Sequence, residues 1–144
     1  MKIDRIFAGL AIAVVLAAPL SAQAAKVALA TTLDGNSESI GGDPDGGGKF
    51  SIELDTESGE VCYLYTVANI ARPKLLQILR GPIGGNGPPA IILEAGSDVC
   101  IDADPKVVSA VIANPGDYYV NFFNTEFPTG AIRGQLVANQ LAAK

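Results

Sequence analysis

Apolar and polar residues alternate with a period of two through most of this sequence, and glycine- and proline-rich turns separate the alternating runs. The clearest run is Phe50–Asp55, in which Phe50, Ile52 and Leu54 occupy every second position. Residues two apart lie on the same face of a β-strand, so the pattern predicts half-buried strands. Because these strands do not alternate with helices, a parallel sheet is not expected. The sequence therefore predicts an all-β, antiparallel Greek-key β-sandwich or barrel of about eight short strands plus one short helix.

The expected strands span residues 26–33, 50–55, 60–70, 74–80, 90–94, 99–102, 118–123 and 131–138. The strand at 60–70 is largely apolar on both faces, so it is either covered on both sides or leaves an aromatic face open. Asp104 followed by Pro105 is typical of a helix start, and Asn114-Pro115-Gly116 ends that helix. Residues 35–48 include six glycines and one apolar residue, which predicts a mobile loop.

The first 24 residues have the features of a signal peptide. Lys2 and Arg5 precede an uncharged apolar run, Ile6–Ala18, and Ala22-Gln23-Ala24 offers small residues for cleavage. At helical rise this run is only about 20 Å long, shorter than the ~30 Å hydrocarbon core of a bilayer. We expect cleavage near Ala24, one mature domain of residues 25–144 without a membrane span, and a secreted or periplasmic location.

The charge balance argues against a nucleic-acid partner. The chain has a formal net charge of −5 at pH 7, and cleavage would remove Lys2, Asp4 and Arg5, which leaves −6. A net anion without a basic cluster is repelled by phosphate backbones. The chain also has no histidine, which excludes Ser-His-Asp and Cys-His nucleophile systems within it. The sequence assigns no catalytic residue, no cofactor and no metal ligand.

Cys62 and Cys100 are the two cysteines of the sequence, and both follow the predicted cleavage site. An even number of cysteines in an exported protein predicts a disulfide. Two separate buried thiols are the alternative. A zinc site is a less favoured interpretation, because two thiolates without histidine supply half of a zinc coordination shell.

Five motifs carry a resemblance to a known family. They are Asn114-Pro115, Tyr118-Tyr119-Val120-Asn121, Phe127-Pro128-x-Gly130-Ala131-Ile132-Arg133-Gly134-Gln135-Leu136, and upstream Gly59-Glu60-Val61-Cys62-Tyr63 and Arg80-Gly81-x-x-Gly84-x-Asn86-Gly87-Pro88. From about Lys26 to Ala138 the chain resembles the CHRD domain, which is named after chordin, an extracellular antagonist of growth factors, and also occurs singly in exported bacterial proteins. The resemblance implies an immunoglobulin-like β-sandwich, and it places Cys100 where bacterial members carry the partner cysteine.

The chain departs from the family pattern at three positions. Members usually carry His-x-His before the Arg80-Gly81 pair and another histidine after the Tyr-Tyr-Val-Asn run, where this chain has Gln77, Leu79 and Phe123. If the family histidines converge, these three side chains should converge too. An imidazole cluster could bind a metal or sense pH, whereas glutamine, leucine and phenylalanine can do neither.

The acidic residues offer one further alternative. The run Asp43–Gly48 resembles a calcium loop, but an EF-hand needs an oxygen ligand where Gly47 lies and a glutamate where Leu54 lies. A looser calcium loop within 35–48 that uses Asp34 stays open. The carboxylate pairs lie at predicted turns and are expected to be solvated: Asp43 with Asp45, Asp102 with Asp104, and Glu53 with Asp55.

The strand from Tyr118 to Phe123 is aromatic on both sides. One side must face the core. The other could form an exposed binding face, made of Tyr119, Asn121, Phe123 and, on the next strand, Arg133, because tyrosine and arginine are favoured at recognition surfaces. The alternative is that both sides are packed.

The leading hypothesis is an exported, non-enzymatic binding or interaction module of the envelope or extracellular space. Its partner would be a protein, a surface polymer or another copy of itself. The alternatives are a self-associating structural component of a matrix or envelope, and an enzyme that uses carboxylates or a metal.

Overall fold

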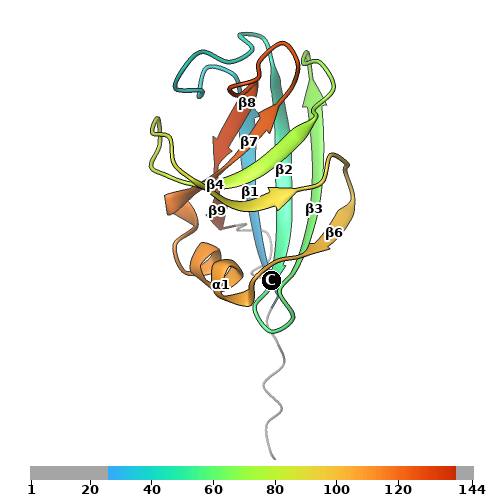
Figure 1. Ribbon diagram of the computed structural model, residues 1–144, viewed down its shortest axis with the longest axis vertical. Helices are drawn as coiled ribbons and strands as arrows, with labels where there is room; N and C mark the ends of the chain where they lie inside the picture. Colours follow the sequence, from blue (N-terminus) through green and yellow to red (C-terminus); the bar gives the residue numbers. More distant parts are fainter. Residues whose placement is uncertain (1–25, 139–144) are drawn as a thin grey trace, which may run out of the picture.

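The computed structural model describes residues 26–138, so the predicted signal peptide, residues 1–24, lies outside the described residues (Figure 1). The described elements are β1 (Lys26–Asp34), β2 (Gly47–Asp55), β3 (Glu60–Ala68), β4 (Leu75–Arg80), β5 (Pro89–Leu93), β6 (Val99–Asp102), α1 (Pro105–Ala113), the 3-10 turn η1 (Pro115–Asp117), β7 (Tyr118–Phe123), β8 (Ile132–Gln135) and β9 (Val137–Ala138). Within this range no helix is long and apolar enough to cross a membrane.

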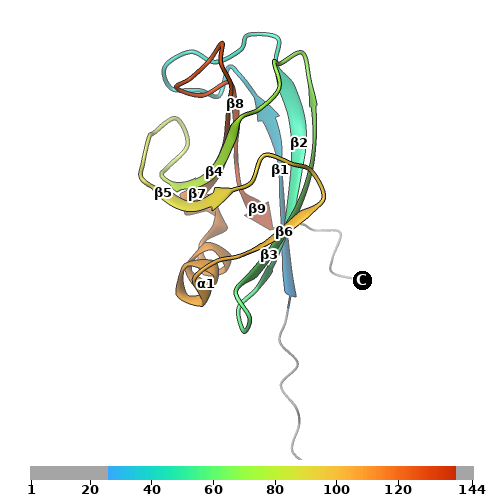
Figure 2. The ribbon, with the colours of Figure 1, turned by 45° about the vertical axis from the view of Figure 1, so that its right-hand side comes forward.

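The strands form one antiparallel sheet in the order β5-β4-β7-β8-β1-β2-β3-β6. The sheet folds over into two layers, β1-β2-β3-β6 and β5-β4-β7-β8, and is nearly closed, like a barrel (Figures 1 and 2). The layers are joined where Asp34 of β1 pairs with Arg133 of β8 and where β9 pairs with β1. The predicted all-β antiparallel class with one short helix is confirmed.

The core lies between the two layers and follows the period-two pattern. Phe50, Ile52 and Leu54 of β2 are at most 1% exposed, and Val120 and Phe122 of β7 face them from the other layer. The Phe50 and Phe122 rings meet edge to face with centroids 6.2 Å apart. Each such fully buried side chain stabilises the fold by roughly 1.5–3 kcal/mol relative to leaving it exposed.

Helix α1 covers the end of the core opposite the glycine-rich loop, as Figure 1 shows. The Asp104 side chain accepts a hydrogen bond of 2.8 Å from the backbone N–H of Lys106, and Pro105 occupies the first turn. Val108 and Val111 are fully buried on one helical face. The predicted helix start, with aspartate as N-cap, is confirmed.

Strand β3 leaves its outer face open. Tyr63 points into the core and is 3% exposed, whereas Leu64 on the other face is 53% exposed, and Thr66 and Ala68 are exposed as well. Neither alternative for the strand at 60–70 describes it: the strand is covered on one side only, and the aromatic face with Tyr63 packs on the core, whereas the open face carries Leu64, Thr66 and Ala68.

The glycine-rich segment 35–48, predicted as a mobile loop, is a loop over 35–46, because Gly47 and Gly48 already belong to β2, and it is tied to the fold. The backbone N–H of Asp43 donates to the carbonyl of Ala131 at 2.8 Å, and that of Gly35 donates to Gly46 at 3.3 Å. Asp43 is 6% exposed. The loop therefore packs over the end of the layer that contains β7 and β8, which places its side chains against those strands.

Candidate functional site

The candidate binding face on β7 and β8 is buried by two loops. Tyr119 is 1% exposed, Asn121 4% and Arg133 2%, while Phe123 is half-buried. Asn121 and Arg133 are register partners on the same face. The alternative in which both sides of the strand are packed therefore describes the fold, and the binding role of these four residues remains a prediction.

Arg133 binds the loop that follows β4. Its guanidinium carbon lies 3.8 Å from the centroid of the Tyr119 ring. Its Nη2 donates to the carbonyl of Gly85 at 2.7 Å, and its Nη1 donates to Asn86 Oδ1 at 3.4 Å. A buried guanidinium with these partners positions the loop 81–88, since both hydrogen bonds are made within the protein.

The Gln135 side chain also binds the backbone of neighbouring loops. Its Nε2 donates to the carbonyls of Gly81, at 2.9 Å, and Gly116, at 2.6 Å, so one side chain ties together the two segments that precede β5 and β7. The Tyr119 hydroxyl accepts from the N–H of Gly87 at 3.3 Å. The residues that carry the family resemblance thus make the contacts that hold the loops.

Gln77, Leu79 and Phe123 lie on one outer face, as the strand period requires. In the register Gln77 lies opposite Asn121, Leu79 opposite Tyr119, and Phe123 opposite Leu75. Gln77 is half-buried and Leu79 is 7% exposed. The three side chains share this face. Leu79 lies opposite Tyr119, and Asn121 separates Tyr119 from Phe123 along the face of β7, so Leu79 and Phe123 are not direct cross-strand neighbours.

A hollow of about 430 Å³ lies between the two loops. Its walls include Ser37, Glu38 and Gly84, and its floor is Arg133 to Gln135 of β8. Glu38 is 83 residues from Asn121 in sequence, yet its Oε2 accepts a hydrogen bond of 3.3 Å from Asn121 Nδ2. Burial raises the pKa of Glu38 to about 7, and the Arg133 charge and the Asn121 hydrogen bond oppose this rise. Sequence reasoning missed Glu38, because nothing local marks it.

The open face of the first layer carries three adjoining hollows, of about 510, 330 and 390 Å³. The first two share Ser51 and Leu64, and the first and third share Lys49 and Thr66, so they form one surface along β2 and β3. We call this surface the outer groove; its apolar centre is lined by Ala30, Thr31, Thr32, Phe50, Ser51, Leu64, Tyr65 and Val137. Small outward side chains on β1 and β2 leave the sheet recessed there, while Leu64 and Val137 are 53% and 54% exposed.

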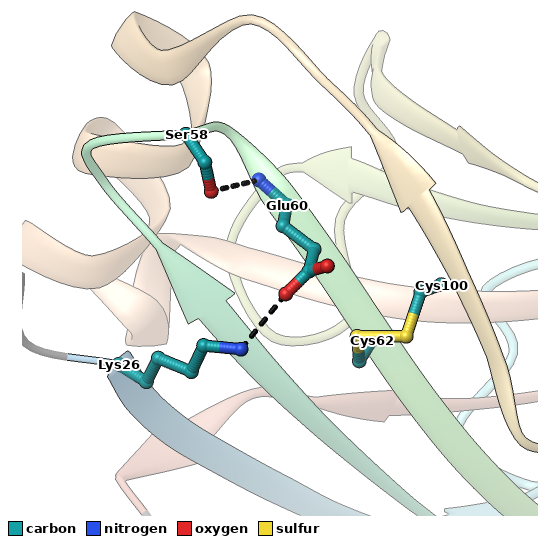
Figure 3. The surroundings of a disulfide bond; sticks show 5 residues. All are labelled: Lys26, Ser58, Glu60, Cys62 and Cys100. Atoms are coloured by element: carbon teal, nitrogen blue, oxygen red, sulfur yellow. Dashed lines mark hydrogen bonds and ion pairs between the residues drawn. A yellow bond between two sulfur atoms is a disulfide. The ribbon is translucent and has the colours of Figure 1, made fainter.

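The predicted disulfide between Cys62 and Cys100 is confirmed (Figure 3). The two cysteines are register partners of β3 and β6, beside the outer groove. Glu60 lies close to both sulfur atoms, but its carboxylate pairs with Lys26 Nζ at 2.8 Å, and bonded sulfurs are not thiolate ligands.

The acidic residues of the glycine-rich segment have local partners. Asp34 accepts from the Ser37 N–H at 2.8 Å and from the Ser37 hydroxyl at 2.7 Å. Burial, followed by the hydrogen bond and charge of Asp45, raises the pKa of Asp43.

A model of the CHRD domain family matches residues 29–136, which is most of the chain and the whole two-layered sheet except its first and last residues. No curated protein and no solved structure matches the chain. The predicted family resemblance is thereby confirmed: the chain belongs to the CHRD domain family.

Proposed function

We propose that this protein is an exported, non-enzymatic module that binds a partner protein on the outer groove. The observation that carries the proposal is the recessed, apolar, open face over β2 and β3, where Leu64 is 53% exposed. A recess lined mostly by apolar groups, with an exposed leucine at its edge, suits an interaction site.

The outer groove fits a binding role better than the face on β7 and β8. Tyr119 and Arg133 are buried and already bound to Gly85, Asn86 and Gly87 within the fold. The outer groove lies instead on a sheet face that no described residue covers, and its hollows follow the strand direction. An extended polypeptide that places an apolar side chain in the central hollow matches this shape.

Two features support export, and two support the absence of catalysis. The N-terminal residues 1–24 have the pattern of a signal peptide, and the Cys62–Cys100 disulfide is of a kind that persists in oxidising compartments. The sequence has no histidine, and the buried Arg133 binds the Gly85 carbonyl and the Asn86 side chain of its own chain.

Leu64→Ser tests the surface with anilinonaphthalene sulfonate as an apolar probe. We expect about tenfold weaker dye binding, because the change removes the largest exposed apolar side chain of the central hollow, and burial of such a side chain is worth roughly 1.5–3 kcal/mol. Ile92→Ser is the matched control, since Ile92 is 63% exposed on the other layer. The measurement is dye fluorescence against protein concentration.

Equal weakening by the two variants, or none with Leu64→Ser, would contradict the proposal. Sedimentation at increasing concentration identifies the kind of partner. If wild type self-associates and Leu64→Ser does not, the groove binds a second copy of the chain, which is the self-associating alternative.

A further inference from the structure

The contact between Glu38 and Asn121 leaves two buried oxygen atoms without a hydrogen-bond partner. Asn121 Nδ2 donates to Glu38 Oε2 at 3.3 Å. Glu38 Oε1 and Asn121 Oδ1, the other oxygens of the same two side chains, accept nothing from any described residue. An ionised carboxylate and an amide carbonyl are both acceptors, so neither can satisfy the other. A buried acceptor without a donor is unfavourable by about 1–3 kcal/mol.

Protonation of Glu38 would give both oxygen atoms a hydrogen-bond partner. If Glu38 is neutral, its Oε1–H can donate to Asn121 Oδ1 while its Oε2 keeps accepting from Asn121 Nδ2, as in an acid–amide pair with two reciprocal hydrogen bonds. We propose that Glu38 and Asn121 form a proton-dependent latch that holds the loop 35–46 over β7.

The surroundings of Glu38 favour its neutral form. A Cβ at Gly130 would lie 2.6 Å from both carboxyl oxygens, which shows how closely the backbone encloses the group. Burial is the largest cause of the raised pKa, about 7; Asp34 raises it further, and Arg133 lowers it. Asp34 at the end of β1 and Arg133 on β8 are thus the charged groups that act on Glu38. The strand partner of Asn121 on β4 is Gln77, which does not titrate.

The latch controls access to a surface. The loop covers Asn121 and Arg133 and forms one wall of the hollow of about 430 Å³ beside them. A carboxyl pKa that is higher in the folded state makes the latch stabilising at low pH, and this contribution is lost as the pH rises from about 4.5 to about 7. Above neutral pH the loop is therefore held less firmly over the face that contains Tyr119, Asn121 and Arg133.

Glu38→Gln provides a direct test, because a glutamine amide can donate to Asn121 Oδ1 and accept from Nδ2 at every pH. Between pH 5.5 and 8.5 we expect the folding equilibrium constant of wild type to fall by about 10- to 30-fold, from the rise of the Glu38 pKa from 4.5 to about 7, reduced for partial exposure. We expect that of Glu38→Gln to change much less. The chain has no histidine, and the α-amino group is common to both proteins, so the difference between them isolates Glu38. Asp43→Asn, at the other loop carboxyl with a raised pKa, should keep the wild-type dependence on Glu38.

Carbon-13 detection of the Glu38 carboxyl, with hydrogen exchange of the 35–46 amides, gives a readout besides stability. The latch predicts a titration midpoint near 7 and faster loop opening above it in wild type, but not in Glu38→Gln. A midpoint below 5, or equal pH dependence of the two proteins, would refute it. Stabilisation of wild type at pH 8.5 by calcium alone, absent in Glu38→Gln, would also refute it, because the two oxygens would then bind a cation.

Discussion

Replacing Cys62 with serine is expected to lower the free energy of unfolding by about 2–4 kcal/mol. The disulfide joins residues 38 apart in sequence, and closing a loop of that length restricts the unfolded chain by about 4 kcal/mol in the chain-entropy account. The disulfide also has a structural role in the folded protein. β6 is a short edge strand whose partner among the described strands is β3, over Glu60 to Tyr63, so the bond anchors this edge of the first layer.

The measurement is urea denaturation of wild type and Cys62→Ser, each with and without a thiol reductant. The reductant should move the wild-type midpoint toward that of the variant and leave the variant unchanged. Cys62→Ser/Cys100→Ser should match the single variant, which shows that an unpaired thiol is not responsible. An unchanged midpoint under oxidising conditions would mean that the bond does not contribute to stability.

The period-two pattern predicted most of the fold because each strand buries one face in a shared core. The strand 118–123 and the strand 99–102 have the bounds that the sequence indicates. The predicted strand 131–138 instead divides into β8 and β9 around the buried Leu136, where the chain passes between the layers. Apolar spacing cannot show that division, since Leu136, Val137 and Ala138 continue one apolar run although both residues of β9 are exposed.

The coverage of the outer faces could not be predicted from the sequence. Tyr119 and Arg133 suit an exposed recognition surface by residue type, but the loops 35–46 and 81–88 cover them. Leu64 suits a covered face by residue type, but nothing described lies over it. Both outcomes depend on contacts between residues distant in sequence, such as Glu38 with Asn121, and alternation within one strand carries no information about them.

The family motifs have a common physical explanation at their C-terminal end. Arg133 and Gln135 bind backbone carbonyls of the segments that precede β5 and β7, and between them Gly134 lies against β1. A run of sequence that joins two layers and two loops is constrained by the fold alone. The outer groove lies on residues other than this C-terminal run, although Cys62 and Tyr63 of an upstream motif line one of its hollows.

Gly134→Ala is expected to destabilise the protein by about 3 kcal/mol or more, because its Cβ would overlap the neighbouring strand. That atom would lie 2.2 Å from the backbone oxygen of Thr32 and 2.6 Å from Thr31 Oγ1. A backbone atom cannot move aside as the end of a flexible side chain can, so β8 must separate from β1 where the two layers join. Gly116→Ala is the matched control: its Cβ would meet nothing within 4 Å, and we expect a change within about 0.5 kcal/mol. Urea midpoints of the two variants measure the difference, and equal midpoints would show that the junction of β8 with β1 tolerates a side chain.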